Sequence, residues 1–448
     1  MGVLEAMETM RTDGHSWSEE RSIAFVNRVF YPDESATSQI LADVAVHLAA
    51  QGWKVEVFTG RHGGNHAVAL ASKDHHQGVG IRRLWSLKLG RRSLFMRLLE
   101  FASFYPSALL ALLRGLKPGQ FVVAKTDPPL ISVIVGIAAK ARGAKFLTWN
   151  QDLYPEVASR LGTPLLSGPL GKFLKQLRNR ALRAANLNIV IGDRMGRHLR
   201  SEGIKRERIV TIPNWSDDRG ATADWDEAAR ALRADWGLRE DDFVIAYSGN
   251  LGRAHEGQTI FGAAKLLAAR QNIRFLVVGG GEENQKLRAR VSQAQLPNFV
   301  FKPHQPRERL GAVLALANAH WLSLRPELEG LIVPSKLYGI LAAGRPVIAV
   351  TAADGEAAEI IQLHGCGTTV QPGNAEALAA TIESWASMPE ELVRMGERGQ
   401  LASRAHYSKS AALALWSTVL TQLHDDHSGL SFRAARRPDA QLSSLHTL

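Results

Sequence analysis

Hydrophobic positions near the start of the chain follow two different periods. Short apolar runs with strand character occur at residues 22–27 (SIAFVN) and 53–60 (WKVEVFTG). Between them, apolar residues recur at helical spacing and stop at Gly52. This order of strand, helix and strand is typical of a β-α-β unit, which joins parallel strands.

The same alternation continues for the rest of the first half. Strand patterns follow at residues 121–126, 145–152, 186–192 and 208–214, and a helical pattern fills residues 130–142. Strands that alternate with helices favour a parallel sheet covered on both faces. We therefore expect an α/β domain over residues 21–215.

A second series of strands begins after an acidic, polar stretch at residues 216–240, which we interpret as a linker. Its predicted strands are 242–249, 275–281, 299–303, 319–324, 346–350 and 367–371. They predict a second α/β domain over residues 241–410, followed by an amphipathic helix at 411–423. We expect residues 1–20 to be flexible and residues 424–448 to be a disordered tail, because neither shows a periodic pattern.

Composition supports a globular protein of two large domains. The chain has 448 residues, of which 45% are hydrophobic and 22% charged. Its single cysteine, Cys366, excludes an internal disulfide, and we expect it in a core. The N-terminal stretch is polar and lacks the apolar segment of a signal peptide, so we expect a cytoplasmic protein.

The charge balance points to an anionic partner. The net charge is +11 and the isoelectric point is about 9.9, which suits nucleic acid, a phosphorylated substrate or an acidic lipid surface. A nucleic-acid binder is disfavoured, because the sequence shows no zinc pattern, helix-turn-helix pattern or aromatic RNA motif.

One basic and apolar segment, residues 89–117, combines Arg91, Arg92, Arg97 and Arg114 with leucine and aromatic residues. It predicts a helix pair that lies in an anionic membrane interface. The alternative is a core helix hairpin with a basic rim. Unbroken apolar runs such as residues 107–113 are shorter than the roughly 20 residues that span a bilayer, so we expect no integral membrane segment.

Three motifs follow predicted strands of the second domain. The first, SGNLGR at 248–253, suits a phosphate, because glycines allow close backbone approach and an arginine can bind phosphate oxygens. It is equally compatible with an ordinary glycine-rich turn. The second, VVGGGEE at 277–283, lacks the spacing of a dinucleotide fingerprint and is weaker.

The third motif, PELEGLIVPSKLYGILAAGRPVIAV at 326–350, is the most specific. It places Pro334, Ser335 and Lys336 together at a predicted helix start. Lys336 and Arg253 would then follow strands of one parallel sheet, at the edge where open α/β folds bind ligands. The alternative for Lys336 is a solvated helix lysine.

Together these motifs resemble glycosyltransferase family 4, in particular the branch found in bacterial capsule, exopolysaccharide and O-antigen biosynthesis. The resemblance covers residues 20–423 and rests on the helix region 30–59, WNQDLYPE, YSGNLGRAHE, FLVVGGGEE and GLIVPSKLYGILAAGRPVI. It implies the GT-B fold, in which two Rossmann-like domains with parallel sheets face a central cleft and the C-terminal helix crosses back to the first domain. The first domain would bind the acceptor and the second the nucleotide sugar.

The resemblance also implies roles for single residues. Arg253 and Lys336 match the two cations that hold the donor pyrophosphate and stabilise the leaving nucleotide diphosphate in place of a metal, so we expect no metal and no cofactor. Such prepositioned cations are the physical answer to charge that develops on a leaving group. The donor-binding positions are Gly249, Asn250, Gly252, Gly280, Pro303, His304, Glu329, Gly330, Leu331, Ile332, Val333 and Ser335.

One departure affects ribose recognition. The family usually has a glutamate five residues before the glycine of LAAG, and Gly339 stands there in this chain. Its usual acidic partner eight residues earlier is Leu331, although Glu327 and Glu329 lie nearby.

Acceptor-side candidates lie in the first domain. Asp152, which follows a strand, is our candidate for orienting the acceptor or the reacting sugar, and Glu156 lies at the same edge. Thr37 and Ser38 open a helix and would either cap it or donate to a phosphate or the acceptor. A purely structural role for Asp152 is equally compatible with its position.

The resulting expectation is a retaining glycosyltransferase that uses a UDP-sugar, or else a GDP-sugar, and a lipid-linked or saccharide acceptor. It would work in the cytoplasm at the inner face of the membrane, without nucleic acid. Two alternatives share the architecture: a nucleotide-sugar 2-epimerase and a catalytically silent partner protein.

Overall fold

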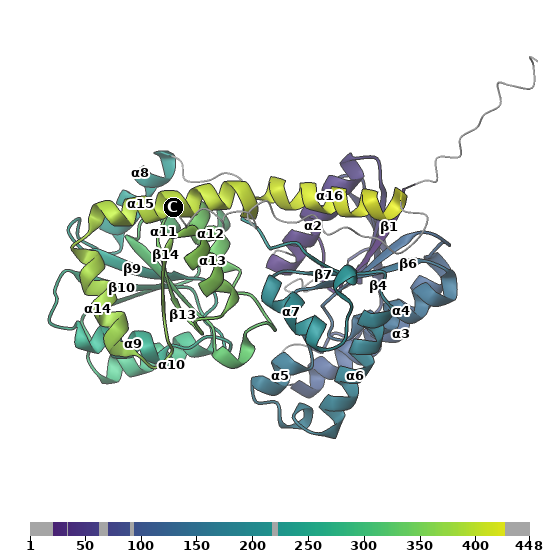
Figure 1. Ribbon diagram of the computed structural model, residues 1–448, viewed down its shortest axis with the longest axis horizontal. Coiled ribbons are helices and arrows are strands. Elements are labelled where there is room, and N and C mark those ends of the chain that lie inside the picture. The colour runs from purple at the N-terminus through teal and green to yellow at the C-terminus, as the bar shows by residue number, and fades with distance from the viewer. Residues whose placement is uncertain (1–20, 34, 62–69, 90–93, 217–222, 426–448) are drawn as a thin grey trace, which may run out of the picture. The chain divides into compact units, whose positions relative to one another are not determined.

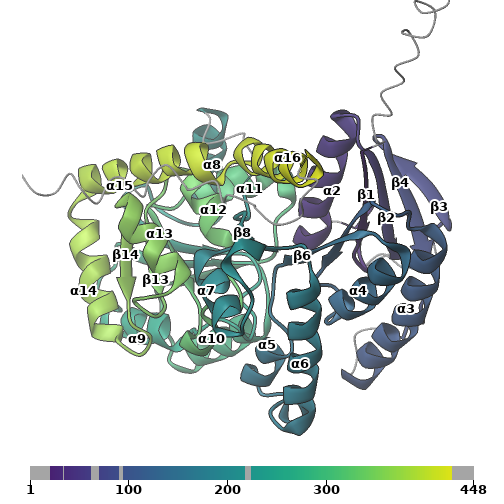
Figure 2. The same ribbon diagram turned by 45° about the vertical axis from the view of Figure 1, so that its right-hand side comes forward.

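The computed structural model describes residues 21–33, 35–61, 70–89, 94–216 and 223–425. The chain divides into two compact units (Figures 1 and 2). The first unit comprises residues 1–123 and 138–145, and the second comprises residues 124–137 and 146–448. The predicted flexible N-terminus, most of the predicted tail, and Arg91 and Arg92 lie outside the described residues.

The first sheet has eight strands in the order β3-β4-β2-β1-β5-β6-β7-β8. The parallel pairs include β1 with β2 and β6 with β7, as the β-α-β pattern predicts. The strands are β1 (Ser22–Val26), β2 (Lys54–Gly60), β3 (Lys73–His76), β4 (Val79–Leu84), β5 (Phe121–Lys125), β6 (Lys145–Asn150), β7 (Leu187–Val190) and β8 (Ile209–Thr211).

Two of these strands correct the sequence prediction. Strands β3 and β4 were not predicted, and β3 pairs with β4 antiparallel, so the first sheet is not wholly parallel. Strand β3 is the sequence KDHH and is mostly exposed, so it carries no apolar alternation that could reveal it.

The second sheet is parallel throughout, with the order β11-β10-β9-β12-β13-β14. Strands β9, β10 and β11 are in register at their carboxyl ends, where Ser248 pairs with Val278 and Val277 with Phe301. The strands are β9 (Phe243–Ser248), β10 (Ile273–Val278), β11 (Phe299–Lys302), β12 (Ala319–Ser323), β13 (Val347–Val350) and β14 (Gly367–Val370).

Helices cover both faces of the second sheet, because alternate residues of its strands enter different cores. Ile245 and Tyr247 share a core with α9, α10 and α14, whereas Val244 and Ala246 share one with α8 and α11. These helices are α8 (Ala223–Asp235), α9 (Gln258–Leu266), α10 (Glu282–Gln293), α11 (Leu310–Ala315) and α14 (Ala375–Ala386).

The remaining helices complete the chain. They are α2 (Ala36–Ala50), α3 (Leu94–Gly115), α4 (Ile131–Arg142), α5 (Glu156–Arg160), α6 (Pro169–Ala184), α7 (Asp193–Ser201), α12 (Lys336–Ala342), α13 (Glu356–His364), α15 (Pro389–Ala402) and α16 (Lys409–Asp425). Cys366 is buried, as predicted.

The predicted linker contains a helix that belongs to the second core. In α8, Ala229 and Leu232 are buried, and Trp236 just beyond it joins them against Val244. The acidic composition of residues 216–240 concealed this helix, because only one of its faces is apolar.

The basic segment at 89–117 contains one continuous helix, α3, in its described part, rather than the predicted pair. Pro106 lies inside this helix without ending it. Residues 96–115 are long and apolar enough to cross a membrane by length and composition alone, although the unbroken apolar runs within them are short. However, Phe104, Ala108 and Leu112 are fully buried at helical spacing, so one face of α3 packs within the first unit.

The C-terminal helix α16 reaches a strand of the first sheet, as predicted. Trp416 of α16 is fully buried and meets Trp149 of β6 edge to face, with ring centroids 4.7 Å apart. Trp215 stacks on the same indole at 6.4 Å. Helix α16 thus packs on the predicted first domain through aromatic contacts.

Candidate active site

Two glycine loops interlock at the carboxyl ends of β9 and β10. A Cβ atom on Gly279 would lie 2.3 Å from the carbonyl oxygen of Gly249, and one on Gly281 would lie 2.3 Å from that of Leu251. Both positions also have φ near +120°, a conformation that only glycine adopts without strain. The amide of Leu251 donates to Gly280 at 2.7 Å, which fixes the two loops to each other.

Lys336, at the start of α12, is partly buried, and its side chain lies against the first of these loops. Its Nζ lies 5.3 Å from the centre of the Tyr247 ring, and a Cβ atom on Gly249 would come within 2.7 Å of its Cε. Burial lowers the pKa of Lys336 to about 8. The lysine is therefore not a fully solvated helix residue. A side chain at position 249 would displace its Cε atom.

His255 adds no competing charge to this site. Burial, together with the positive charge of Lys336, lowers its pKa to about 4, so the ring is neutral at pH 7. Its Nδ1 lies 2.6 Å from the carbonyl oxygen of Ser323.

Arg253 lies further along the same loop and is exposed. Its guanidinium donates to the carbonyl oxygen of Leu161, at the end of α5, and its Nε lies 3.8 Å from Glu282. An exposed arginine with one distant carboxylate keeps most of its hydrogen-bond donors available for a phosphate.

The loop before α12 is held by its own acidic residue. The carboxylate of Glu329 accepts hydrogen bonds from Thr351 and from the amide of Glu356 (3.2 Å). Burial raises its pKa. Gly330 has φ of +74° and would bring a Cβ atom 3.4 Å from Arg194, so the loop passes close to α7.

Glu356, whose amide binds Glu329, also binds the start of α7 through its side chain. Its carboxylate accepts from the amides of Asp193 (3.0 Å) and Arg194 (2.7 Å) at the start of that helix. A carboxylate at a helix N-terminus satisfies free amides and complements the helix dipole. A Cβ atom on Gly192 would lie 2.5 Å from this carboxyl group, so a larger residue there would displace the carboxylate.

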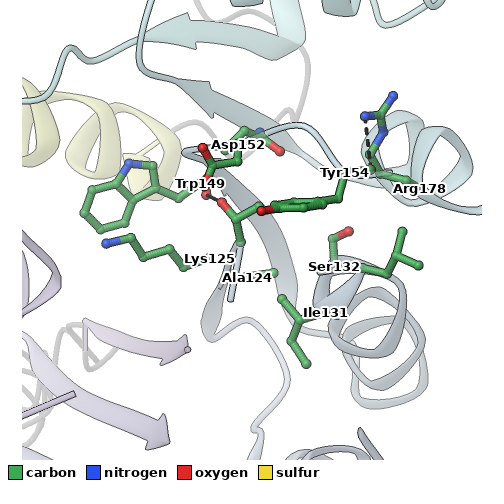
Figure 3. Close-up of a pocket in the computed structure, with 11 residues that line it drawn as sticks. Ala124, Lys125, Ile131, Ser132, Trp149, Asp152, Tyr154 and Arg178 are labelled. Atoms are coloured by element: carbon green, nitrogen blue, oxygen red, sulfur yellow. Dashed lines mark hydrogen bonds between the residues drawn. The ribbon is translucent and has the colours of Figure 1, made fainter. Parts of the chain in front are cut away.

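A pocket lies at the ends of β5 and β6, in the second unit (Figure 3). Lys125 is only 1% exposed, and its Nζ lies 4.3 Å from the centre of the Trp149 ring. Burial lowers the pKa of Lys125 to about 7. The pocket is lined by Ala124, Lys125, Thr126, Leu130, Ile131, Ser132, Trp149, Asn150, Asp152, Tyr154 and Arg178.

Asp152 faces this pocket, and burial raises its pKa to about 6. The charge of Asp127 acts in the same direction and that of Lys125 opposes it. The pocket therefore combines a titratable carboxyl group with hydroxyl, amide and aromatic groups, which are the partners that sugar hydroxyls need.

Glu156 does not line the pocket but binds Arg178, which does. Both of its oxygens accept from Arg178, at 2.7 and 2.8 Å. Although burial acts to raise it, the His198 ring, whose Nε2 lies 3.8 Å from the carboxylate, and the charge of Arg178 lower the pKa of Glu156 to about 2.

Glu156, His198 and Glu202 form the one trio within the described chain that could hold a metal ion. Lys175 lies 2.5 Å from Glu202 and 3.7 Å from Glu156. Cations already neutralise these carboxylates, which makes the trio an ion-pair network rather than a metal site.

The other predicted residues have varied surroundings. Pro303 and His304 are exposed after β11, and Ser335 is exposed at the start of α12. Leu331 and Val333 are buried in the core, and Ile332 packs against it. Asn250 accepts from the Tyr247 hydroxyl through its carbonyl, and Gly252 lies between it and Arg253.

The structure corrects the predicted cap of α2 and shows what surrounds Gly339. The cap of α2 is Ser35, whose hydroxyl accepts from the amide of Ser38 at 3.4 Å, so neither Thr37 nor Ser38 caps the helix. Gly339 faces Leu314, 3.6 Å from the place of a Cβ atom.

Sequence reasoning missed Lys125, Glu356 and the specific roles of Gly279 and Gly281. Lys125 had one visible signal, because it is the only charged residue in the strand FVVAK. Glu356 had none, since a glutamate at the start of α13 is typical of any helix.

Two family models match the chain. The family described as glycosyl transferases group 1 matches residues 229–402, and the glycosyl transferase 4-like domain matches residues 35–215. Among curated proteins, WcaI of Escherichia coli K12, described as a colanic acid biosynthesis glycosyl transferase, is 26% identical over 378 residues, or 81% of this chain and 91% of WcaI. WbjE of Pseudomonas aeruginosa, described as a glycosyltransferase, is 23% identical over 68% of this chain and 75% of WbjE.

Solved structures share the architecture at low sequence identity. Sucrose-phosphate synthase from Thermosynechococcus elongatus has a TM-score of 0.70 at 18% identity, covering 90% of this chain and 99% of the synthase. Anabaena HepE in complex with UDP-glucose has a TM-score of 0.66 at 16% identity, covering 90% of this chain and 100% of HepE. At these identities the likeness establishes the fold alone.

Proposed function

The chain belongs to the group 1 glycosyltransferases of family 4 and has their GT-B fold, and on this premise we propose the reaction that it catalyses. It transfers a hexose or N-acetylhexosamine-type sugar from a nucleotide diphosphate, preferably UDP, to a lipid-linked or saccharide acceptor. The pathway is cell-surface polysaccharide biosynthesis. The printed description of WcaI supports this pathway, and the HepE complex with UDP-glucose supports the donor class.

The observation that carries the proposal is the position of Lys336. A partly buried lysine that lies against a glycine loop at the end of a parallel strand is suited to a diphosphate, because partial removal from water strengthens its attraction for an anion. As the bond between sugar and diphosphate breaks, negative charge grows on the leaving group. Lys336 and Arg253 then stabilise that charge without reorganisation.

The pocket at β5 and β6 is the proposed acceptor site. Asp152, ionised above its pKa of about 6, accepts a hydrogen bond from the acceptor hydroxyl and orients it. The charge of Lys125 opposes the effect of burial and so lowers the pKa of this carboxyl group. Arg178, fixed by Glu156, completes the wall.

Two features of the reaction follow from the family alone. We expect front-face transfer with retention at the anomeric carbon, and we expect no metal, since two cations take its place. NMR assignment of an inverted linkage would contradict the first. Loss of activity in EDTA with recovery in magnesium or manganese would contradict the second.

We further propose that the protein works at the inner face of the cytoplasmic membrane through residues 89–117. In α3, Met96, Leu98 and Leu99 are 37–46% exposed, and Arg97 beside them is also exposed. An apolar and basic helix face of this kind suits an anionic lipid surface. Sedimentation with acidic vesicles checks this, with Arg91, Arg92, Arg97 and Arg114 replaced by glutamine in the control.

The test of the function is transfer from UDP-, GDP- and ADP-sugars to membrane lipid extracts, with Asp152→Asn and Lys336→Met beside the wild type. Transfer from one donor, lost in both variants, is the expected result. Interconversion of the donor sugar without an acceptor would instead identify an epimerase. Binding of no nucleotide at all would leave the silent-partner alternative.

A further inference from the structure

A second exposed apolar surface lies far along the chain from α3, in the second unit. It consists of Leu165 in the short helix η1 (Pro164–Leu166) and of Leu170 and Phe173 in the first turns of α6. Their side chains are 61%, 42% and 55% exposed. In Figures 1 and 2, α5 and α6 lie at the lower edge of the second unit. We call these three residues the apolar tip.

The segment that carries the apolar tip has only one sign of charge. No aspartate or glutamate occurs from Val157 to Gly192. Exposed cations on and beside α6 are Arg160, Lys172, Arg180 and Arg183. A surface that is apolar at one end and uniformly cationic behind it complements an anionic lipid surface.

The spacing along α6 suits this occupant. At 1.5 Å per residue, Arg180 lies roughly 10 Å behind Phe173 along the helix axis. Interfacial segments bury their apolar groups about 5–10 Å into the headgroup and acyl boundary. With the apolar tip at that depth, Arg180 lies at the level of the lipid phosphates, and the long side chain of Lys172 extends from the tip toward them.

The middle of α6 is held by ion pairs and hydrogen bonds to its neighbours, so docking requires little rearrangement. Arg178 bonds both oxygens of Glu156, Lys175 lies 2.5 Å from Glu202, and Asn179 donates to Glu202 at 2.8 Å. A surface that is already ordered loses little entropy on binding.

We propose that the apolar tip inserts into anionic membrane and forms a contact separate from residues 89–117. Helix α6 carries Leu170 and Phe173 of the apolar tip and, five residues after Phe173, Arg178, which lines the pocket. Insertion would therefore place the pocket about 7–8 Å from the tip along the axis, at headgroup level. The head of a lipid-linked acceptor lies there, and this last step rests on the proposed function.

The lone cysteine makes a direct test possible. Cys366 is buried, and burial raises the pKa of its thiol to about 11, so it reacts slowly with thiol reagents. Leu165→Cys and Phe173→Cys, each labelled with the polarity-sensitive dye NBD, report the surroundings of the apolar tip. The matched control is Leu401→Cys in α15, at a position that is 65% exposed, and Leu98→Cys reports α3 separately.

With vesicles that contain phosphatidylglycerol, the labels at 165 and 173 should brighten several-fold and shift to the blue, while the label at 401 stays unchanged. Vesicles of phosphatidylcholine alone should have a much smaller effect. Replacing Lys172 and Arg180 by glutamine should weaken vesicle binding by about fivefold for each charge.

Three outcomes would overturn the inference. A response at 98 but none at 165 and 173 would leave docking by α3 intact and remove the apolar tip from the membrane. No response at any position would remove both contacts. A response at 165 and 173 that depends on protein concentration without vesicles would identify an interface between copies of the chain.

Discussion

At the residue scale, burial lowers the pKa values of two lysines, Lys336 and Lys125, which we expect to have different roles. Burial lowers the pKa of Lys336 to about 8 and that of Lys125 to about 7. Lys336 packs against Gly249, whereas Lys125 has Asp127 and Asp152 as charged neighbours. Lys336 is therefore suited to receive an anion, and Lys125 to tune a carboxyl group.

Nucleotide binding should depend on pH through Lys336. A bound diphosphate favours the charged lysine and raises its pKa, so binding above pH 8 requires the uptake of a proton. The affinity for UDP should fall as the pH rises from 8 to 10, by at most tenfold per unit. Calorimetry in two buffers of different ionisation enthalpy measures the proton uptake.

Lys336→Met should weaken UDP binding and remove this pH dependence. The control is Lys265→Met, at an exposed lysine of α9, which should bind UDP as the wild type does. If the UDP affinity of Lys336→Met still fell between pH 8 and 10, the titrating group would be a different residue.

Transfer activity should rise with pH through about 6, because Asp152 must lose its proton to accept a hydrogen bond. Asp152→Asn should lower kcat by roughly a hundredfold and flatten this acidic limb. Lys125→Met removes the cation that lowers the pKa of Asp152, so the limb should move to higher pH. The measurement is a pH–rate profile of the wild type and the two variants. An acidic limb at the same pH in Lys125→Met as in the wild type would mean that Lys125 does not affect the pKa of Asp152.

At this scale the sequence predicted residues that belong to a motif and missed those that depend on folding. Lys336 was predicted because Pro334 and Ser335 precede it at a helix start. Lys125 and Asp152 are 27 residues apart in the chain, and only the order of strands β5 and β6 brings them to one pocket. Propensity and spacing carry no information on such pairs.

At the scale of elements, the carboxylate of Glu356 binds two amides at the start of α7 and lies close to Gly192. Gly192→Ala should destabilise the protein by about 1–3 kcal/mol, because its Cβ atom meets the Glu356 carboxyl group. Glu356→Ala should cost about 1–2 kcal/mol through the loss of two amide partners.

In the double variant the clash disappears, so the combined cost should be smaller than the sum. Urea unfolding of the four proteins measures this coupling. Additive costs would mean that Gly192 and Glu356 act independently.

Strong apolar periods made most elements predictable. The strands of the second sheet and helix α16 appear where the pattern places them, within two residues at most ends. Strand β3 and helix α8 were missed, because charge dominates their composition. Helix α3 is one helix rather than the predicted pair, and Pro106 lies on its exposed side without ending it.

At the scale of the whole chain, the C-terminal helix α16 packs on the predicted first domain through Trp416. Trp416→Ala should cost about 3–5 kcal/mol, because the indole is fully buried against Trp149. The melting temperature should fall by several degrees. Gln422→Ala, at an exposed position of the same helix, is the control, and an equal melting temperature for the two variants would contradict the packing role.

The fold itself does not identify a reaction, since the GT-B architecture is shared at 15–18% identity by the synthase and HepE. The proposed reaction therefore depends on the donor site around Gly249, Arg253 and Lys336.

Thermal-shift measurement with UDP, GDP, ADP and NAD tests this site most directly, with Arg253→Ala and Lys336→Ala as comparison. A ligand at 100 times its Kd adds about 2.7 kcal/mol of stability. We predict that one nucleoside diphosphate, UDP before GDP, raises the melting temperature of the wild type and of neither variant. Stabilisation that survives in both variants, or none with any nucleotide, would contradict the donor site.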